Sequence, residues 1–157
     1  MSSMKNEPEI LVADDDINIS RLIQLYLEKE GFIVSVCHRG DDAVNAFWQE
    51  NFAGIGSWYL AQKKDDDLII SASPEFLVGA AAEKLGVQLI GTRMDIHSGK
   101  ISGENCHDEE KVRRFYEVYP DGEIDAFYSD SLADTPLASI AKHAFLVKKG
   151  IMSAWPN

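Results

Sequence analysis

The stretch DDLIISASPEF, residues 66–76, decides the fold of this chain. Its apolar centre, Leu68–Ser71, has the length and composition of a buried strand. Pro74 and Glu75 then suit the first turn of a helix, before which Ser71 could also act as a cap. Open α/β sheets bind their ligands at the carboxyl ends of the strands, which is where Ser71 stands. The stretch therefore predicts a strand, a turn and a helix, with a hydroxyl at the ligand edge.

The first third of the chain predicts a similar unit. Ile10–Ala13 is apolar, three aspartates follow it, and apolar residues then recur at helical spacing. Asp16 or Asn18 can cap this helix, and Gly31 supplies the left-handed residue that ends it. Phe32–Cys37 is a β-branched second strand. The order strand–helix–strand predicts a parallel sheet covered by helices.

We expect residues 1–157 to form a single three-layer α/β domain with a doubly wound, mostly parallel sheet. The expected strands are Ile10–Ala13, Phe32–Cys37, Leu68–Ser71, Val87–Gly91, Ile124–Tyr128 and Phe145–Val147. The expected helices centre on Ile19–Lys29, Asp42–Lys63, Glu75–Leu85, Glu110–Val118 and Pro136–Lys142. A small β-hairpin is expected over Arg93–Ser102, turned at Ser98-Gly99.

Composition limits the partners. Fifteen Lys and Arg against 26 Asp and Glu give a formal net charge of -11, which repels nucleic acid and anionic membranes. The leader MSSMKNEPE has no apolar stretch and no run could cross a bilayer, so we expect a soluble, cytoplasmic protein, and a monomer. Cys37 and Cys106 are too few for a disulfide framework or a CxxC site, and we expect free thiols.

The opening of the chain resembles the receiver domain of bacterial response regulators. The segments "ILVADDD" and "EKEGFIVSVCHRGDDAV", with the amphipathic helix between them, follow that family's opening over residues 1–47. The resemblance implies a flavodoxin-like fold and Mg²⁺ held by Asp14 and Asp15. Clustered carboxylates repel one another unless a hard cation sits among them, which gives the pattern a physical reason. The alternative is an acidic helix N-terminus favoured by the helix dipole.

Residues 48–157 resemble the haloacid dehalogenase (HAD) superfamily of phosphotransferases, particularly its small phosphoserine-phosphatase-like branch. The motifs are "LIISASPEF", "HDEEKVRRF" and "FYSDSLADTPL". The resemblance implies that Ser71 hydrogen-bonds the transferring phosphoryl group and that Lys111 neutralises charge beside it. It also implies that Asp130 and Asp134 bind Mg²⁺ directly or through water. Phosphoryl transfer requires this positioning and neutralisation of charge. Taken singly, Ser71 and Asp130 could be helix caps and Lys111 a surface charge.

The second resemblance lacks its own first motif and its cap domain. In the HAD superfamily, an aspartate at the end of the first strand forms an aspartyl-phosphate, and an aspartate two residues later is the general acid and base. Asp14 and Asp16 stand in this relation. Asn18 replaces the family's usual threonine or serine, and Ile17 replaces its glycine. The alternative is a circularly permuted alignment, in which the receiver's acidic pair matches Asp130 and Asp134 and the chain has no nucleophile.

Three functions follow as hypotheses. The first is a Mg²⁺-dependent phosphatase-type site for a small phosphorylated substrate or phosphate. The second is a receiver-like phosphorylation switch of two-component signalling, although the phosphoacceptor strand is replaced. The third is a folded chimera, natural or engineered, without catalysis and with its seam between Val44 and Gly56. Under the first hypothesis the candidate catalytic residues are Asp14, Asp16, Ser71 and Lys111. The candidate metal ligands are Asp14, Asp15, Asp16, Asp130 and Asp134.

Overall fold

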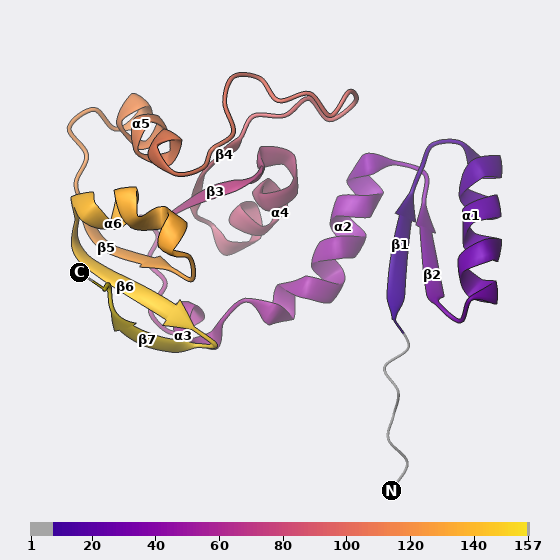
Figure 1. The fold of residues 1–157 in the computed structure, drawn as a ribbon, viewed down its shortest axis with the longest axis horizontal. Coiled ribbons are helices and arrows are strands. Elements are labelled where there is room, and N and C mark those ends of the chain that lie inside the picture. The colour runs from indigo at the N-terminus through magenta and orange to yellow at the C-terminus, as the bar shows by residue number, and fades with distance from the viewer. Residues whose placement is uncertain (1–7, 157) are drawn as a thin grey trace, which may run out of the picture. The chain divides into compact units, whose positions relative to one another are not determined.

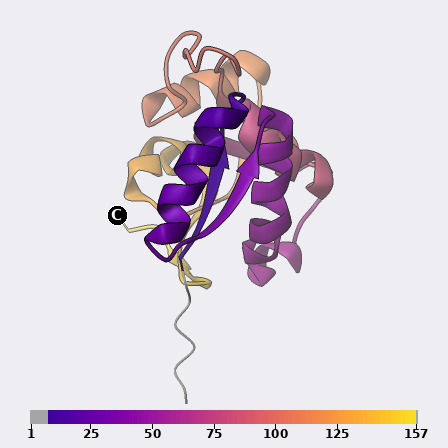
Figure 2. The same cartoon turned by 90° about the vertical axis from the view of Figure 1, so that its right-hand side faces the viewer.

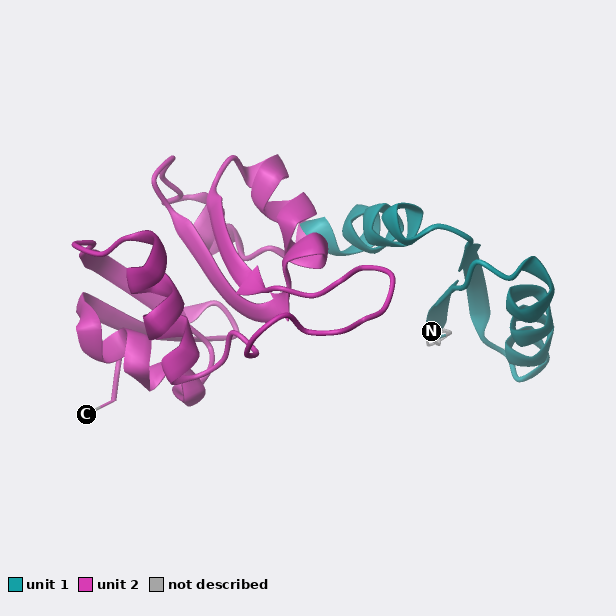
Figure 3. Cartoon of the chain, turned by 90° about the horizontal axis from the view of Figure 1, so that it is seen from above, with its two compact units in different colours: residues 1–52 teal, residues 53–157 magenta. Residues whose placement is uncertain are grey.

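The computed structural model describes residues 8–156, and the chain divides into two compact units, residues 1–52 and residues 53–157 (Figure 3). Both units are α/β, with strands and helices alternating along the chain (Figure 1). The α/β class expected from the sequence is confirmed. The boundary between the units falls between Phe52 and Ala53.

Unit 1 is a strand–helix–strand–helix segment. It consists of β1 (Glu9–Ala13), α1 (Ile17–Lys29), β2 (Ile33–Cys37) and α2 (Gly40–Asn51). The two strands pair in parallel, and both helices contact the strand pair (Figure 2). The side chain of Asp16 caps α1 by accepting hydrogen bonds from the amides of Asn18 and Ile19. Gly31, with φ +89°, follows the last turn, as its left-handed role requires.

Unit 2 contains the rest of the regular structure. Its helices are α3 (Ser57–Leu60), α4 (Glu75–Leu85), α5 (Glu109–Val118) and α6 (Thr135–Ile140), and its strands are β3 (Leu68–Pro74), β4 (Gln88–Thr92), β5 (Ile124–Ser129), β6 (Ala141–Lys148) and β7 (Ile151–Ala154). Two short 3₁₀ helices, Phe52–Gly54 and Leu132–Asp134, complete the list. The buried apolar side chains of this unit are Ala81, Ala82, Ile90, Cys106, Phe115, Leu137, Ala138 and Val147.

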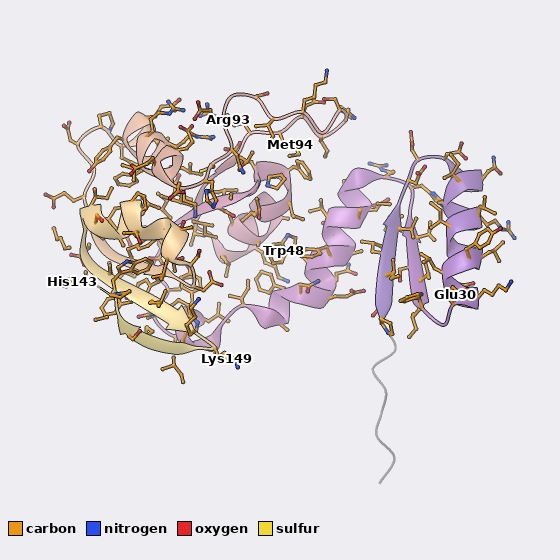
Figure 4. The ribbon with its side chains drawn as sticks, in the orientation of Figure 1. Glu30, Trp48, Arg93, Met94, His143 and Lys149 are labelled. Atoms are coloured by element: carbon orange, nitrogen blue, oxygen red, sulfur yellow. The ribbon has the colours of Figure 1, made fainter. Side chains whose placement is uncertain are left out.

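The single doubly wound sheet expected from the sequence is not formed by the described residues. The strands make three small sheets, in the orders β1-β2, β3-β4 and β5-β6-β7. The pairs β1-β2, β3-β4 and β5-β6 are parallel, whereas β7 pairs antiparallel to β6. A turn at Lys149-Gly150, both with positive φ, returns the chain along β6, so β7 occupies the second edge of that strand (Figure 4). The sequence pattern did not anticipate β7.

Two expected helices have different bounds in the structure. The helix expected over Asp42–Lys63 is broken into α2, a 3₁₀ turn and α3, since the chain changes direction at the glycines between them. At Gly56 an added Cβ would lie 2.3 Å from Nε1 of Trp58, so a larger residue at this position would displace the Trp58 ring. The helix expected over Pro136–Lys142 ends at Ile140, because Ala141 already pairs with Ile124 as the start of β6.

The hairpin expected over Arg93–Ser102 is present, starting from the labelled Arg93 and Met94 (Figure 4). Met94 makes an antiparallel bridge with Ile101, and the amide of Ser102 donates to the carbonyl of Arg93 over 2.8 Å. Gly99 takes φ +66° in the turn. Within residues 8–156, no helix combines the length and the apolar character needed to cross a membrane.

Candidate functional site

A buried ion pair lies at the centre of the candidate site in unit 2. Nζ of Lys111 lies 2.5 Å from Oδ1 of Asp134, and the two side chains are only 8% and 12% exposed. Lys111 is in the first turn of α5, and Asp134 ends the 3₁₀ turn that leads into α6. Removing charges from water is costly unless each is paired, so this pair fixes the separation of the two elements.

The second carboxylate oxygen of Asp134 is also engaged. The hydroxyl of Ser129, the last residue of β5, donates to Oδ2 of Asp134 over 2.6 Å. The amide of Ser131 in turn donates to Oγ of Ser129 over 3.0 Å. The Asp130 side chain is exposed, and its backbone carbonyl accepts a hydrogen bond from Lys148. The motif FYSDSLADTPL therefore presents one fixed, buried carboxylate and one exposed carboxylate.

Ser71 lies inside β3, which extends to Pro74 and so beyond the expected strand end at Ser71; the register of β3 is irregular between Ile70 and Pro74. Its Oγ accepts a hydrogen bond from the amide of Ser73 over 3.1 Å, and the side chain is half-buried. A hydroxyl that accepts from an amide keeps its own proton for another acceptor. Ser71 is therefore arranged as a hydrogen-bond donor, which is the role that a phosphate-binding hydroxyl has.

The three aspartates of the acidic loop lie in unit 1, and the carboxylates of Asp14 and Asp16 accept hydrogen bonds from neighbouring backbone amides. Oδ1 of Asp14 accepts from the amide of Asp16 over 2.8 Å, and Asp16 caps α1 as described above. Asp15, Asp16, Ile17 and Asn18 line a shallow, open depression at the start of the helix. The amide of Asp14 also donates to the carbonyl of Cys37, which ties the loop to the end of β2.

Within each unit, the structure unites part of the predicted set. Lys111 and Asp134 are in direct contact, and Asp14 contacts the backbone of Asp16. Among residues 8–156, no group of three or more His, Cys, Asp or Glu side chains is placed to hold a metal ion. Both oxygens of Asp134 accept hydrogen bonds from protein groups, whereas the side chain of Asp130 is exposed. The described residues therefore do not form a complete metal site.

The sequence interpretation missed several residues around this pair. Ser129 stands inside a quoted motif, one residue before Asp130, and its position at a strand end could have marked it. Arg114 and Glu75 form a second ion pair of 3.0 Å, in which the Arg114 side chain is 4% exposed. Arg114 follows Lys111 by one helical turn, so the periodicity of α5 places both on one face. The sequence did not indicate which carboxylate pairs with Lys111 or with Arg114.

Cys106 is fully buried beside this face of α5. Its amide donates to Oγ1 of Thr92 over 3.0 Å. Burial raises the pKa of the Cys106 thiol, and the nearby charges of Arg114 and Lys111 oppose that rise. The thiol stays protonated at neutral pH and acts as a small apolar side chain.

Unit 2 contains a half-buried serine on β3 and a buried lysine–aspartate pair, and unit 1 contains an acidic loop after a parallel strand. Hydroxyl, ammonium and carboxylate groups are the groups that phosphoryl-transfer proteins use. Residues 20–139 match the family model of the haloacid dehalogenase-like hydrolases. The match covers more than half of the chain, so the chain belongs to this family. No solved structure matches it significantly.

Three curated proteins illustrate the similarity. Two proteins named CicA, from two strains of Caulobacter vibrioides, are 40% identical to this chain over 81 residues, which is 47% of this chain and 36% of CicA. The transcriptional regulatory protein ResD of Bacillus subtilis is 38% identical over 47 residues, 30% of this chain and 20% of ResD. The chain therefore spans about a third of the length of the CicA proteins and a fifth of ResD. The partial similarity to a response regulator agrees with the resemblance seen in the opening of the chain.

Proposed function

We propose that this chain is a phosphatase-type HAD hydrolase whose phosphate-binding residues lie in unit 2, and that its substrate is a small phosphorylated molecule. The observation that carries the proposal is the buried Lys111–Asp134 pair. A carboxylate that holds an ammonium group in place gives a fixed cation, and fixed charge is what stabilises a transferring phosphoryl group.

Two side chains of unit 2 have hydrogen-bond capacity left for a phosphate. Ser71 accepts from Ser73 and keeps its own proton. The ammonium group of Lys111 has three protons, and one serves Asp134. Both side chains therefore keep donors for phosphoryl oxygens while their positions are held by protein contacts. In this proposal Ser71 binds the phosphoryl group and Lys111 neutralises its charge.

Asp14 is the proposed nucleophile and Asp16 the proposed general acid and base. Asp14 directly follows β1, which ends at Ala13, and Asp16 lies two residues further on. The carboxylate of Asp16 already accepts two amide hydrogen bonds as a helix cap. Proton transfer by Asp16 would have to proceed while it keeps that role.

Members of this family are typically Mg²⁺-dependent, and Asp130 is the residue we propose as a ligand in unit 2. Its carboxylate is exposed and has no hydrogen-bond or ion-pair partner among the described residues. The metal would supply charge neutralisation beside the phosphoryl group. Because one carboxylate binds Mg²⁺ weakly, the melting temperature should rise with millimolar Mg²⁺, and Asp130→Asn should remove most of that rise.

Hydrolysis of p-nitrophenyl phosphate with Mg²⁺ tests the proposal. Wild-type protein should release p-nitrophenol slowly. Asp14→Asn should abolish turnover, Lys111→Ala should reduce it severely, and Asp16→Asn should slow it by about 10²–10⁴-fold. Lys142→Ala, which removes an exposed lysine paired with Glu123, is the matched control and should retain the rate. No release above a metal-only blank, or full activity in Asp14→Asn, would contradict the proposal.

A second candidate is a folded domain that binds phosphate or metal without catalysis. The observation that favours it is the engagement of Asp14 and Asp16 in backbone hydrogen bonds within the helix start. The same assay separates the two candidates, because a binding domain gives no turnover and its affinity for phosphate survives Asp14→Asn.

A further inference from the structure

The ion pair between the buried side chain of Arg114 and the partly exposed carboxylate of Glu75 links three elements of unit 2. Glu75 is the first residue of α4. It directly follows the Ser71 turn, which is the irregular last part of β3, residues 71–74. Its Oε1 accepts from Nη2 of Arg114 over 3.0 Å and from the amide of Gly91 over 3.3 Å. One carboxylate oxygen thus connects the start of α4 with β4 and with α5.

Close packing reinforces this link at Gly91. A Cβ added to Gly91 would lie 2.8 Å from Cγ of Glu75 and 3.1 Å from the carbonyl oxygen of Ser73. Real Cβ atoms essentially never come within 3.0 Å of another heavy atom. The turn from Ser73 to Glu75 therefore rests directly on the backbone of β4, and the absence of a side chain at Gly91 allows it.

Hydrogen bonds of Thr92 form a second link between β3, β4 and the loop before α5. The hydroxyl of Thr92, next to Gly91 and 1% exposed, lies 2.7 Å from the carbonyl oxygen of Ala72. It also accepts from the amide of Cys106, in the loop that leads into α5. Ala72 is the neighbour of Ser71. Consecutive residues of β4 thus hold the Ser71 turn on one side and the approach to Lys111 on the other.

Arg114 places this network next to the candidate site. It lies one turn after Lys111 on the buried face of α5, so the contact with Glu75 fixes both the rotation and the depth of the helix. The Arg114 side chain is 4% exposed, whereas its neighbour Arg113 is 62% exposed and pairs with Glu110 on the same helix. Arg113 therefore offers a matched comparison on the same helix.

We propose that Arg114 is a positioning residue, which acts through Glu75 to hold the Ser71 turn and Lys111 in register for binding one phosphoryl group. The proposal rests on the phosphate-binding role of Ser71 and Lys111 given above. It assigns no contact between Arg114 and the phosphate. Lys111 and Arg114 of α5 then have different roles. Lys111 binds the phosphoryl group, and Arg114 sets the distance between Lys111 and Ser71.

Orthophosphate titration of the full chain, followed by amide chemical shifts, tests the proposal. The titrations use wild type, Arg114→Met, Arg114→Lys and the control Arg113→Met, at a temperature where each variant is folded by circular dichroism. Arg114→Met should weaken phosphate binding by about tenfold, the equivalent of about 1.4 kcal/mol. Arg114→Lys should restore part of the affinity, and Arg113→Met should bind as wild type does.

Amide hydrogen exchange on the same proteins, without phosphate, gives an independent result. Arg114→Met should speed exchange in residues 71–77 and 106–112 more than in β5 and β6, whereas Arg113→Met should not. Gly91→Ala should displace the same turn without removing a charged side chain, and it should reproduce both effects. This variant replaces Arg114→Met in the test if Arg114→Met does not fold.

The outcomes separate the two proposals. Unchanged phosphate affinity in folded Arg114→Met, or faster exchange spread evenly over unit 2, would overturn the positioning role and leave Arg114 as a structural residue. If wild-type protein does not bind orthophosphate, the proposed function fails. The exchange pattern then decides by itself whether Arg114 holds the Ser71 turn.

Discussion

The two units of this chain differ in what their helices and strands bury. Among the described residues of unit 1, Val12 and Ser20 are the buried side chains. Helix α1 leaves Ile17, Leu22 and Tyr26 largely exposed. Unit 2 buries Phe115, Leu137 and Val147 among other apolar side chains, and it also buries the Lys111–Asp134 ion pair and the side chain of Arg114. Regular secondary structure forms in both units, but an apolar core forms in unit 2.

The difference shows that a local sequence pattern can specify helices and strands without specifying an apolar core. Unit 1 has a capped helix, a left-handed glycine and two parallel strands, which are all local or nearly local features. A two-stranded sheet with its helices buries too little apolar surface to be stable alone. Unit 2 supplies three more parallel and antiparallel strand pairings, and it can therefore meet the cost of burying charged side chains.

The largest expected effect is at the buried ion pair. Lys111→Met should lower the free energy of unfolding by about 3–5 kcal/mol, because Asp134 would keep a buried charge without a partner. Adding Asp134→Asn to this variant should restore part of the loss. Urea unfolding followed by circular dichroism measures both. Lys142→Met, at an exposed pair, should leave the midpoint unchanged. An equal loss in the two lysine variants would contradict the account.

The second effect compares two leucines of the two units. Leu137 is 1% exposed in α6, and Leu22 is 56% exposed in α1. Leu137→Ala should cost about 2–5 kcal/mol through lost burial and a cavity. Leu22→Ala should stay within about 0.5 kcal/mol of wild type.

We expect residues 1–157 to unfold as one domain, so fluorescence and circular dichroism should give the same single transition. Two separate transitions would count against a single domain.

Thiol labelling sharpens the comparison between the units in the native state. Cys37 in β2 is half-buried, while Cys106 in unit 2 is fully buried and has a pKa raised by burial. A thiol reagent at neutral pH should modify Cys37 at least about tenfold faster than Cys106, since Cys106 is inaccessible and burial raises the pKa of its thiol. Cys37→Ser and Cys106→Ser assign the two rates by mass spectrometry. Faster labelling of Cys106 would show that the core of unit 2 opens readily.

The smallest effect concerns acid stability in unit 2. The hydrogen bond from Arg113 lowers the pKa of Glu110 below its ordinary value of 4.5. A lowered folded-state pKa means that the stabilisation is fully present above the unfolded-state pKa and is lost as pH falls through the folded-state value. Arg113→Gln should therefore reduce stability near neutral pH and flatten its decline below about pH 4.5. Urea midpoints measured across that range test this, and a parallel decline in both proteins would contradict it.

Much of the local structure was predictable from the sequence, because its signals are local. The apolar run before Ser71, the cap at Asp16 and the turn at Gly99 each predict the element that the structure contains. The motif HDEEKVRRF also placed Lys111 correctly at a helix start. These features depend on a few neighbouring residues, so they can be read without knowledge of the rest of the fold.

The pairing of side chains was less predictable because it depends on tertiary packing. Nothing near Lys111 in the sequence indicates that Asp134, 23 residues later, is its partner. The contact of Arg114 with Glu75 spans 39 residues. The strand β7 was missed because its four residues, Ile151–Ala154, are too few to show the alternation that marks a strand. The single sheet was expected from family resemblance, whereas the strands pair in three separate groups.

The most direct test of the central claim asks which unit receives a phosphate. Orthophosphate is added to wild-type protein, and the backbone amide shifts of residues 8–156 are followed by NMR. The account predicts saturable shifts at Ser71, Ser73 and the first turn of α5, which Lys111→Met removes. Shifts confined to residues 15–18 of unit 1, or shifts around Ser71 that persist in Lys111→Met, would contradict it.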